Sequence, residues 1–329
     1  MIKNRQQLLV KGRNNCVFTF LFLSLVVITA CAQPSIPSFV KNSVEGIEKI
    51  IPADASIEKL AGDLRFTEGP VWSSEGFLLF SDIPANTVYK LVNTDLSVFL
   101  EPSGNSNGLT FEPSTGHLVL CEHSGRRVSK LVSKERVTIV DTYQGKKLNS
   151  PNDIVYKSDG SFYFTDPPYG IGGDDSDKKE IPFNGIYHFH DGNLTLLDST
   201  FTRPNGIALS PDESYLYVAN SDPDDKYWKK FPVLNDGTLG EGEVLHRIVN
   251  PKGGGGPDGL KVDVKGNVYC TEHEGVWIFS PEGIHLGTIE FPEVPANCTW
   301  GGADNKTLFV TARNSVYKID LLIEGFLSY

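Results

Sequence analysis

Residues 203–220 read RPNGIALSPDESYLYVAN, and this stretch contains one complete unit of a repeated pattern from which the fold can be predicted. Asn205, a polar residue between Pro and Gly, is followed by an apolar segment, a turn at Pro211-Asp212 and a second apolar segment. Short β-type segments bounded by Gly, Pro, Asn and Asp are typical of antiparallel strands. The stretch therefore predicts a β-hairpin that opens on an asparagine.

The same unit recurs throughout the chain beyond residue 55. Its six openings are spaced 39, 45, 53, 53 and 42 residues apart. They are Glu68-Gly69-Pro70, Asn107-Gly108, Pro151-Asn152-Asp153, Pro204-Asn205-Gly206, Pro257-Asp258-Gly259 and Trp300-Gly301-Gly302. A repeat of about 40 to 50 residues rich in short strands indicates a propeller blade. We therefore expect residues 55–329 to form an all-β, six-bladed β-propeller with four-stranded blades around a central channel.

The two ends of this repeat region suggest how the ring is closed. Residues 56–60 precede the first opening, and we expect them to supply the outer strand of the sixth blade, because closure removes exposed sheet edges. The third unit is lengthened by an acidic run, GGDDSD at residues 172–177. We interpret this run as a solvated loop in preference to a metal site.

The first residues have the features of an export signal. Four basic residues precede residues 17–29, an apolar segment too short for a comfortable membrane span. Ile28-Thr29-Ala30-Cys31 resembles the lipobox of bacterial lipoproteins, with cleavage of a plain signal peptide near Ala30 or Ala32 as the alternative. We predict a lipoprotein signal peptide at residues 1–30, lipid on Cys31, a tether at residues 31–54, and a periplasmic or cell-envelope location.

Charge and cysteine content narrow the range of partners. Without residues 1–30 the chain has 26 Lys and Arg against 41 Asp and Glu, a formal charge of −15. This argues against nucleic acid and anionic membrane surfaces as partners, so we expect membrane contact only through the lipid.

Cys121, Cys270 and Cys298 lie in apparent strands, where we expect small buried side chains and no disulfide. The oligomeric state is left open.

The openings also predict a functional site, because the innermost strand of each blade starts at the central channel. Glu68, Asn107, Asn152, Asn205 and Asp258 should therefore converge. Each motif alone is typical of a turn. Two carboxylates directed at one axis repel each other without a cation, however, and carboxylates with amide oxygens suit a hard divalent ion. We expect Ca²⁺ before Mg²⁺, with Mn²⁺ and Zn²⁺ as further alternatives.

A second set of polar residues lies near the ends of the second strands and in the segment DPPYG. We expect Arg126, His273 and Tyr169 to contact a substrate, together with Asn107 and Asn152. His123 is a candidate for proton transfer, although histidines at strand ends are also common structural residues.

Several motifs resemble one known family: FTEGPVW at residues 66–72, LNSPNDIV at 148–155, FTDPPYGI at 164–171, GGGPDGLKVD at 254–263 and PANCTWGG at 295–302. From residue 60 to 321 the chain resembles the family of senescence marker protein, regucalcin, gluconolactonase and luciferin-regenerating enzyme, and most of all its bacterial gluconolactonases. The resemblance implies a six-bladed propeller with metal ligands at Glu68, Asn205 and Asp258. It matches Asn152 to a position that binds the metal or the substrate. Animal members have an arginine two residues earlier, where this chain has Ser150, so the sugar is left open.

The leading hypothesis is a metal-dependent lactonase that hydrolyses a sugar lactone to the aldonic acid, with the cation polarising the lactone carbonyl. Either Asp258 or His123 would transfer the proton. An esterase or phosphotriesterase of the same fold and a non-catalytic, calcium-containing binding module are the alternatives. The chain has no Gly-x-Ser-x-Gly elbow, zinc helix, Walker loop or dinucleotide fingerprint, which argues against a serine hydrolase.

Overall fold

The computed structural model describes residues 36–249 and 256–329, and the structural statements below concern this part of the chain. The predicted signal peptide at residues 1–30 and the predicted lipid site at Cys31 lie outside the described residues. Among the described residues, no helix combines the length and the apolar character needed to cross a membrane.

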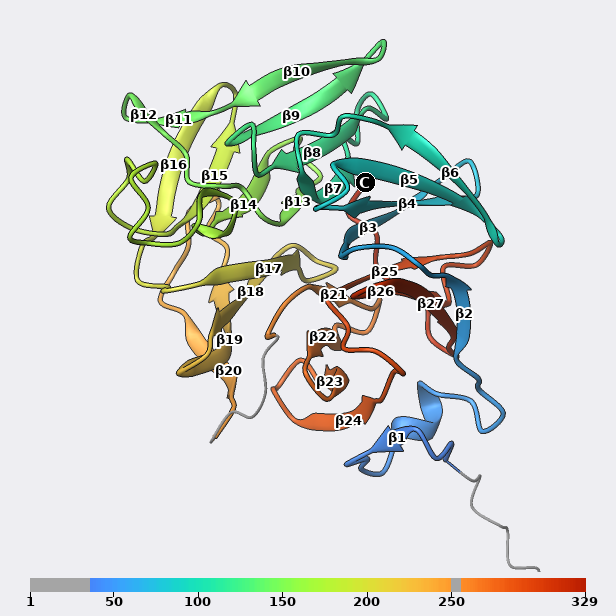
Figure 1. Cartoon of the computed structure of the whole chain (residues 1–329). Coiled ribbons are helices and arrows are strands. Elements are labelled where there is room, and N and C mark those ends of the chain that lie inside the picture. The colour runs from blue at the N-terminus through green and yellow to red at the C-terminus, as the bar shows by residue number, and fades with distance from the viewer. Residues whose placement is uncertain (1–35, 250–255) are drawn as a thin grey trace, which may run out of the picture. The chain divides into compact units, whose positions relative to one another are not determined.

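Six four-stranded antiparallel blades follow one another along the chain (Figure 1). Blades one to three consist of β3 (Thr67–Ser73), β4 (Phe77–Asp82), β5 (Thr87–Val92), β6 (Asp95–Leu100), β7 (Ser106–Phe111), β8 (Leu118–Glu122), β9 (Arg127–Val132), β10 (Glu135–Val140), β13 (Ile154–Tyr156), β14 (Phe162–Asp166), β15 (Gly185–His190) and β16 (Asn193–Asp198). Blades four to six consist of β17 (Pro204–Leu209), β18 (Tyr215–Asp222), β19 (Asp225–Pro232), β20 (Glu243–Arg247), β21 (Leu260–Val262), β22 (Val268–Glu272), β23 (Gly275–Phe279), β24 (His285–Ile289), β25 (Asn297–Gly301), β26 (Thr307–Ala312), β27 (Ser315–Asp320) and β2 (Glu58–Ala61). A small hairpin of β11 (Thr142–Tyr143) and β12 (Lys146–Lys147) precedes blade three. The six-bladed propeller predicted from the repeat is confirmed.

The ring closes as the sequence predicts. Strand β2, from the start of the propeller, pairs with β27 at its end, and Glu58 lies opposite Lys318. The sixth blade therefore takes its outer strand from residues that precede the first blade. This pairing removes the open edge that β27 would otherwise expose.

Neighbouring blades are held together by apolar side chains from both faces of their sheets. Tyr217 and Trp228 of blade four, for example, pack in one buried cluster with Leu260 and Phe279 of blade five. A sheet that is covered on both faces has apolar residues at successive positions instead of strict alternation. This explains why segments such as FLLFSD in β4 are buried at every position.

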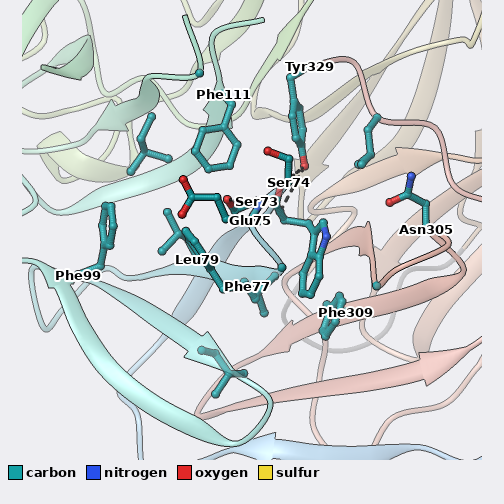
Figure 2. Close-up of a pocket in the computed structure, with 18 of the residues that line it drawn as sticks. Ser73, Ser74, Glu75, Phe77, Leu79, Phe99, Phe111, Asn305, Phe309 and Tyr329 are labelled. Carbon is teal, nitrogen blue, oxygen red and sulfur yellow. Dashed lines mark hydrogen bonds between the residues drawn. The ribbon is translucent and has the colours of Figure 1, made fainter.

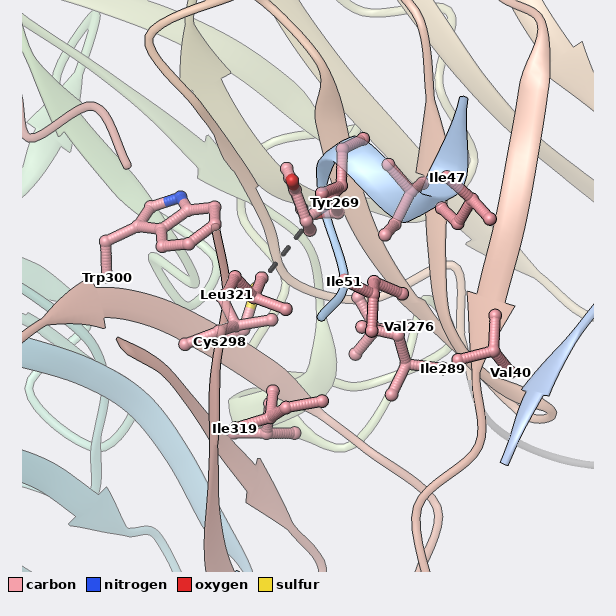
Figure 3. Packing of buried hydrophobic residues seen from close by; sticks show 14 residues of the cluster. Val40, Ile47, Ile51, Tyr269, Val276, Ile289, Cys298, Trp300, Ile319 and Leu321 are labelled. Atoms are coloured by element: carbon pink, nitrogen blue, oxygen red, sulfur yellow. Dashed lines mark hydrogen bonds between the residues drawn. The ribbon is translucent and has the colours of Figure 1, made fainter. Parts of the chain in front are cut away.

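Residues 36–54 are packed against the propeller, and the prediction that they belong to a tether is wrong. Strand β1 (Val40–Lys41) adds a fifth strand to blade five by pairing with β24, and the 3₁₀ helix η1 (Ile47–Lys49) follows. Ile47 and Ile51 are buried in the same cluster as Val276 and Ile289 (Figure 3). Burial of these apolar side chains offsets the conformational entropy that a free tether would keep.

The C-terminal segment Phe326–Tyr329 lies across one end of the central channel. Together with the innermost strands of all six blades it lines a space of about 30 Å³, room for one or two water molecules. The Tyr329 hydroxyl donates a 3.0 Å hydrogen bond to Trp72 O and accepts one of 3.2 Å from Trp72 N. The segment thus fills this end of the channel and is fixed to blade one.

The structure also describes the three cysteines and the acidic run. Cys121, Cys270 and Cys298 are buried and free of disulfides. In the acidic run, the Asp174 carboxylate forms ion pairs with Arg203 and Lys179. It is thus occupied by basic side chains of its own blade and the next one.

Candidate active site

Five of the six predicted blade openings converge at the other end of the channel from the C-terminal segment. The sixth, Trp300-Gly301-Gly302, does not, because Trp300 lies near the end of β25 and is buried in the core. The five openings line a cavity of about 330 Å³, within the range of small-molecule sites. The sequence-predicted residues that the structure brings together there are Glu68, Asn107, His123, Asn152, Tyr169, Asn205 and Asp258. Five of the six blades contribute to this set, so the site exists only in the closed ring.

Three openings are held in place by a repeated contact. The last Asp or Asn near the end of the second strand accepts a hydrogen bond from a backbone N–H just before the opening residue of its own blade. Asp82 Oδ2 accepts from Arg65 N at 2.8 Å, Asp166 Oδ2 from Asn149 N at 2.7 Å, and Asn220 Oδ1 from Arg203 N at 2.9 Å. These contacts fix the loops that present Glu68, Asn152 and Asn205, so Asp82 and Asp166 act on the site through its backbone.

Glycines next to the opening residues allow adjacent blades to touch at the channel. The Gly206 N–H donates to Asp258 O at 3.2 Å, and a Cβ on Gly206 would lie 2.2 Å from that oxygen. Gly69 has a φ of +49°, and a Cβ there would lie 1.9 Å from Asn107 O. Only glycine permits these approaches. The Asn-Gly and Glu-Gly pairs are therefore inter-blade contacts as well as turns.

The amide side chains form a hydrogen-bonded row around the cavity. Asn107 Nδ2 donates to Asn152 Oδ1 at 2.6 Å, Asn152 Nδ2 donates to Asn205 Oδ1, and Asn205 Nδ2 donates to Ser221 Oγ at 2.8 Å. The oxygen Asn107 Oδ1 is buried and has no hydrogen-bond partner among the described residues. Because a buried, unpaired acceptor is costly, this oxygen indicates a ligand that is not part of the chain.

Two carboxyl groups from blades one and five meet in the cavity wall. Desolvation and the neighbouring Glu68 carboxylate raise the pKa of Asp258 well above the usual value for an aspartate. Burial likewise raises the pKa of Glu68, although Gly69 N and Asn297 Nδ2 donate hydrogen bonds to its Oε2. The site therefore holds two carboxyl groups close together, each with a raised pKa, an arrangement that favours binding of a cation.

His123 and Tyr169 lie beside the amide row. His123 Nε2 is 3.3 Å from Asn152 Oδ1, and burial lowers the pKa of His123 to about 4, so its ring is neutral near pH 7. Tyr169 starts the 3₁₀ helix η2 (Tyr169–Ile171) and is 40% exposed. Ser150 fixes this helix, since its Oγ accepts from Gly170 N at 2.8 Å and donates to Pro167 O at 2.7 Å.

Residues 66–314 match the model of the SMP-30/Gluconolactonase/LRE-like region. The chain belongs to this family. It is 34% identical to the gluconolactonase of Zymomonas mobilis, over 94% of this chain and 97% of that protein. The solved structure of a gluconolactonase from Xanthomonas campestris is 29% identical, with a TM-score of 0.79 over 88% of this chain and 96% of that one. A calcium-binding regucalcin from Agrobacterium tumefaciens, 19% identical with a TM-score of 0.68 over 82% of this chain and 96% of that one, shares the fold.

The residues that line the cavity at the blade openings include oxygen donors that fit a hard divalent cation. Carboxylate oxygens from Glu68 and Asp258 and amide oxygens from Asn152 and Asn205 are the donor types that Ca²⁺ and Mg²⁺ accept. Among the described residues no group of three or more His, Cys, Asp and Glu side chains is placed to hold a metal. A cation here would depend on the amides as much as on the carboxylates, and such a donor set suits Zn²⁺ poorly.

Two predicted substrate contacts do not line the cavity. The Arg126 guanidinium donates to the backbone oxygens of Leu148 and Lys147 and to Glu180, so it supports the loop before blade three. The structure therefore gives the predicted substrate contact of Arg126 no support. His273, directly after β22, is also not among the residues that line the cavity.

Sequence analysis missed other residues of the cavity wall. Ser221, Pro223, Lys226 and Gly256 line its blade four and blade five side, and Phe66 and Ile83 add apolar surface on blade one. Lys226 follows no motif and lies in a strand with an ordinary sequence, DKYWKKFP. Its place in the cavity wall becomes apparent only from the structure, where it lies beside blade five.

A larger hollow of about 1150 Å³ lies at the opposite ends of the strands of blades one, two and six (Figure 2). Its walls include the aromatic rings of Phe77, Phe99, Phe111, Phe309 and Tyr329, with Ser73 and Glu75 at a turn (Figure 2). Of the six predicted blade openings only the last contributes to it, through Gly302, and none of the five that line the smaller cavity does. The smaller cavity at the openings is therefore the candidate active site.

Proposed function

We propose that this chain is a lactonase that hydrolyses a sugar lactone such as D-glucono-1,5-lactone to the aldonic acid and depends on a divalent cation, Ca²⁺ in the first instance. The observation that carries the proposal is the meeting of Glu68 and Asp258 with the amide row in one cavity. Membership of the family and 34% identity to a gluconolactonase over almost the whole chain support the substrate class.

Each group of the cavity has a distinct task in this proposal. Glu68, Asn152, Asn205 and Asp258 would hold the cation, which when bound polarises an ester carbonyl and stabilises negative charge on its oxygen. Asn107, with its unpaired Oδ1, and Tyr169, at the rim, would orient the lactone ring. Phe66 and Ile83 exclude water from one side of the cavity.

We assign proton acceptance from the attacking water to Asp258 in preference to His123. The Asp258 carboxylate lies in the cavity beside the other polar groups. His123 Nε2 is already hydrogen-bonded to Asn152 Oδ1, and its lowered pKa makes the ring a poor acceptor. The role of His123 is then to hold Asn152 in the orientation that the amide row requires.

A substrate panel tests the proposal. Purified full-length chain is assayed with aldonolactones, aryl esters and phosphotriesters, each with EDTA and with Ca²⁺, Mg²⁺, Mn²⁺ or Zn²⁺ restored. We expect hydrolysis of aldonolactones that EDTA abolishes while the circular dichroism spectrum stays unchanged. Faster hydrolysis of aryl esters or phosphotriesters would instead support an esterase of the same fold, and the absence of any hydrolysis would support a binding module.

We also propose that the chain is exported and anchored through Cys31, on the sequence of residues 17–31 alone. Metabolic labelling with a radioactive fatty acid tests this in a bacterial host. Label in the wild type and its loss in Cys31→Ser is the expected result. Label in neither would indicate a plain signal peptide or no export.

A further inference from the structure

A buried ion pair that belongs to neither the amide row nor the carboxylate pair reaches the cavity wall through one of its members, Lys226. Lys226, near the start of β19 in blade four, is 2% exposed, and Glu272, at the end of β22 in blade five, is 3% exposed. Lys226 Nζ donates to Glu272 Oε1 at 3.0 Å. Glu272 Oε2 accepts a further hydrogen bond from Glu274 N at 3.1 Å. The pair therefore spans the boundary between two blades.

The fold places Lys226 beside the proposed cation ligands. In the β18–β19 pairing Lys226 lies directly opposite Ser221, whose Oγ accepts from Asn205 Nδ2 at 2.8 Å. Directly opposed residues project to the same face of a sheet with their β-carbons close together. Lys226 consequently faces the cavity, and the Ser221 that lies opposite it is hydrogen-bonded to Asn205.

The ammonium group has donors to spare. A lysine carries three N–H donors, and Glu272 is the one acceptor that Lys226 Nζ has among the described residues. The remaining donors belong to a side chain that is almost wholly buried and that lines a cavity. Buried donors ordinarily find acceptors, so this wall of the cavity is built for oxygen atoms of a ligand.

A purely structural role does not account for the pair. Two apolar residues would join blades four and five at least as well as a buried ion pair, and the surrounding contacts of these blades are apolar, as in the cluster around Trp228. Glu272 also cancels the charge of Lys226, which removes any strong preference for an anion. The expected acceptor is then a neutral oxygen, such as a hydroxyl group.

We propose that Lys226, held by Glu272, binds ring hydroxyl groups of the substrate and thereby determines specificity for polyhydroxylated lactones. This inference rests on the proposed lactonase function and adds a specificity residue on the wall formed by blades four and five. Lys226 would recognise the sugar part of the molecule, and the residues around Asp258 would act on the ester. Lactones without hydroxyl groups would not use the contact.

The test compares six-membered ring ligands that carry the hydroxyl and hydroxymethyl groups of a sugar with ligands that lack them. Lys226→Met removes the ammonium but leaves the Glu272 charge unpaired, so Lys226→Met/Glu272→Gln is the main variant, and Lys229→Met on the same strand is the matched control. Hydrolysis of D-glucono-1,5-lactone and δ-valerolactone is measured with the cation supplied. Binding of the unreactive pair 1,5-anhydro-D-glucitol and tetrahydropyran is measured by calorimetry, and thermal unfolding monitors the fold.

We expect the double variant to keep its fold and to lose about tenfold or more in kcat/KM for the hydroxylated lactone, with less than about a twofold change for δ-valerolactone. Its affinity for 1,5-anhydro-D-glucitol should fall by a similar factor, and Lys229→Met should resemble the wild type. Equal losses for both lactones, or an unchanged affinity for the polyol, would overturn the proposal. If the wild type hydrolyses neither lactone, the proposed function fails, and calorimetry with the polyol still decides the role of Lys226. Absence of polyol binding to the wild type would refute that role as well.

Discussion

Asn297 Nδ2 donates a 3.1 Å hydrogen bond to Glu68 Oε2, and this contact joins the sixth blade to the first at the cavity. Asn297 itself does not line the cavity. It therefore acts on the proposed cation through the position of Glu68. Hydrogen bonds to a metal-ligating side chain orient its oxygen atoms toward the metal and so influence the affinity for the metal.

Asn297→Ala should weaken binding of the divalent cation by about 10- to 100-fold, the range for loss of an outer contact at a metal site. Titration calorimetry with Ca²⁺ measures the affinity. Asn193→Ala, at an exposed position at the start of β16, is the control and should bind like the wild type. Unchanged affinity in Asn297→Ala would show that Glu68 either keeps its position unaided or does not bind the cation.

Asp258→Asn should have opposite effects on function and on the stability of the cation-free protein. It removes one of two adjacent carboxylates, so lactonase activity and cation binding should be lost while the thermal midpoint in EDTA rises by a few degrees. The rise follows from the lost repulsion with Glu68, since residues tuned for function are often held at a cost in stability. Differential scanning fluorimetry in EDTA provides the measurement, and a lower midpoint would contradict the expectation.

Gly206→Ala should destabilise the propeller by about 1 to 3 kcal/mol, as overpacking does elsewhere. The added Cβ would lie 2.2 Å from the backbone oxygen of Asp258, so blades four and five must move apart. Gly287→Ala is the matched control, because its Cβ would meet the nearest atom, in Ile47, at an ordinary 3.4 Å. Urea denaturation compares the two variants, and similar midpoints would contradict the proposed inter-blade contact.

His188 in blade three should make the stability of the protein fall in acid. Burial lowers the pKa of His188, and the nearby His190 lowers it further. As the pH falls below about 6.5, the unfolded chain binds a proton that the native His188 does not, so the free energy of unfolding decreases. The stabilisation is fully present above that pH and is lost as the pH approaches the lower native pKa.

His188→Phe should remove this pH dependence and keep the packing, because the ring of His188 stacks on Tyr163 with centroids 4.7 Å apart. Urea denaturation at pH 7.5 and pH 5.5 gives the free energies of unfolding. The wild type should lose more stability between the two values than the variant. Equal losses would mean that His188 contributes nothing to acid sensitivity.

Features that repeat within one blade could be predicted from the sequence. Each opening, hairpin and turn is a local pattern, so the number of blades and the convergence of Glu68, Asn152, Asn205 and Asp258 follow from the repeat alone. Closure of the ring by residues 56–60 could also be predicted, because one outer strand was missing from the last unit.

Contacts between blades could not be predicted. The pairing of Lys226 with Glu272 depends on the register of two separate sheets, and no local pattern identifies a lysine that faces its neighbour. The same limit explains Arg126, which lies close to His123 in sequence but directs its guanidinium to the loop before blade three. The burial of Val40 and Ile47 in blade five could not be predicted either, because a short apolar segment does not show which surface will cover it.

The C-terminal segment has a kinetic consequence for the proposed enzyme. Because Phe326–Tyr329 and the six innermost strands leave only about 30 Å³ at one end of the channel, an aldonic acid cannot pass through the ring and must depart on the side from which the lactone arrived. The product must then leave through the opening of the cavity before the next substrate can enter. A propeller open at both ends would not impose this single-file exchange.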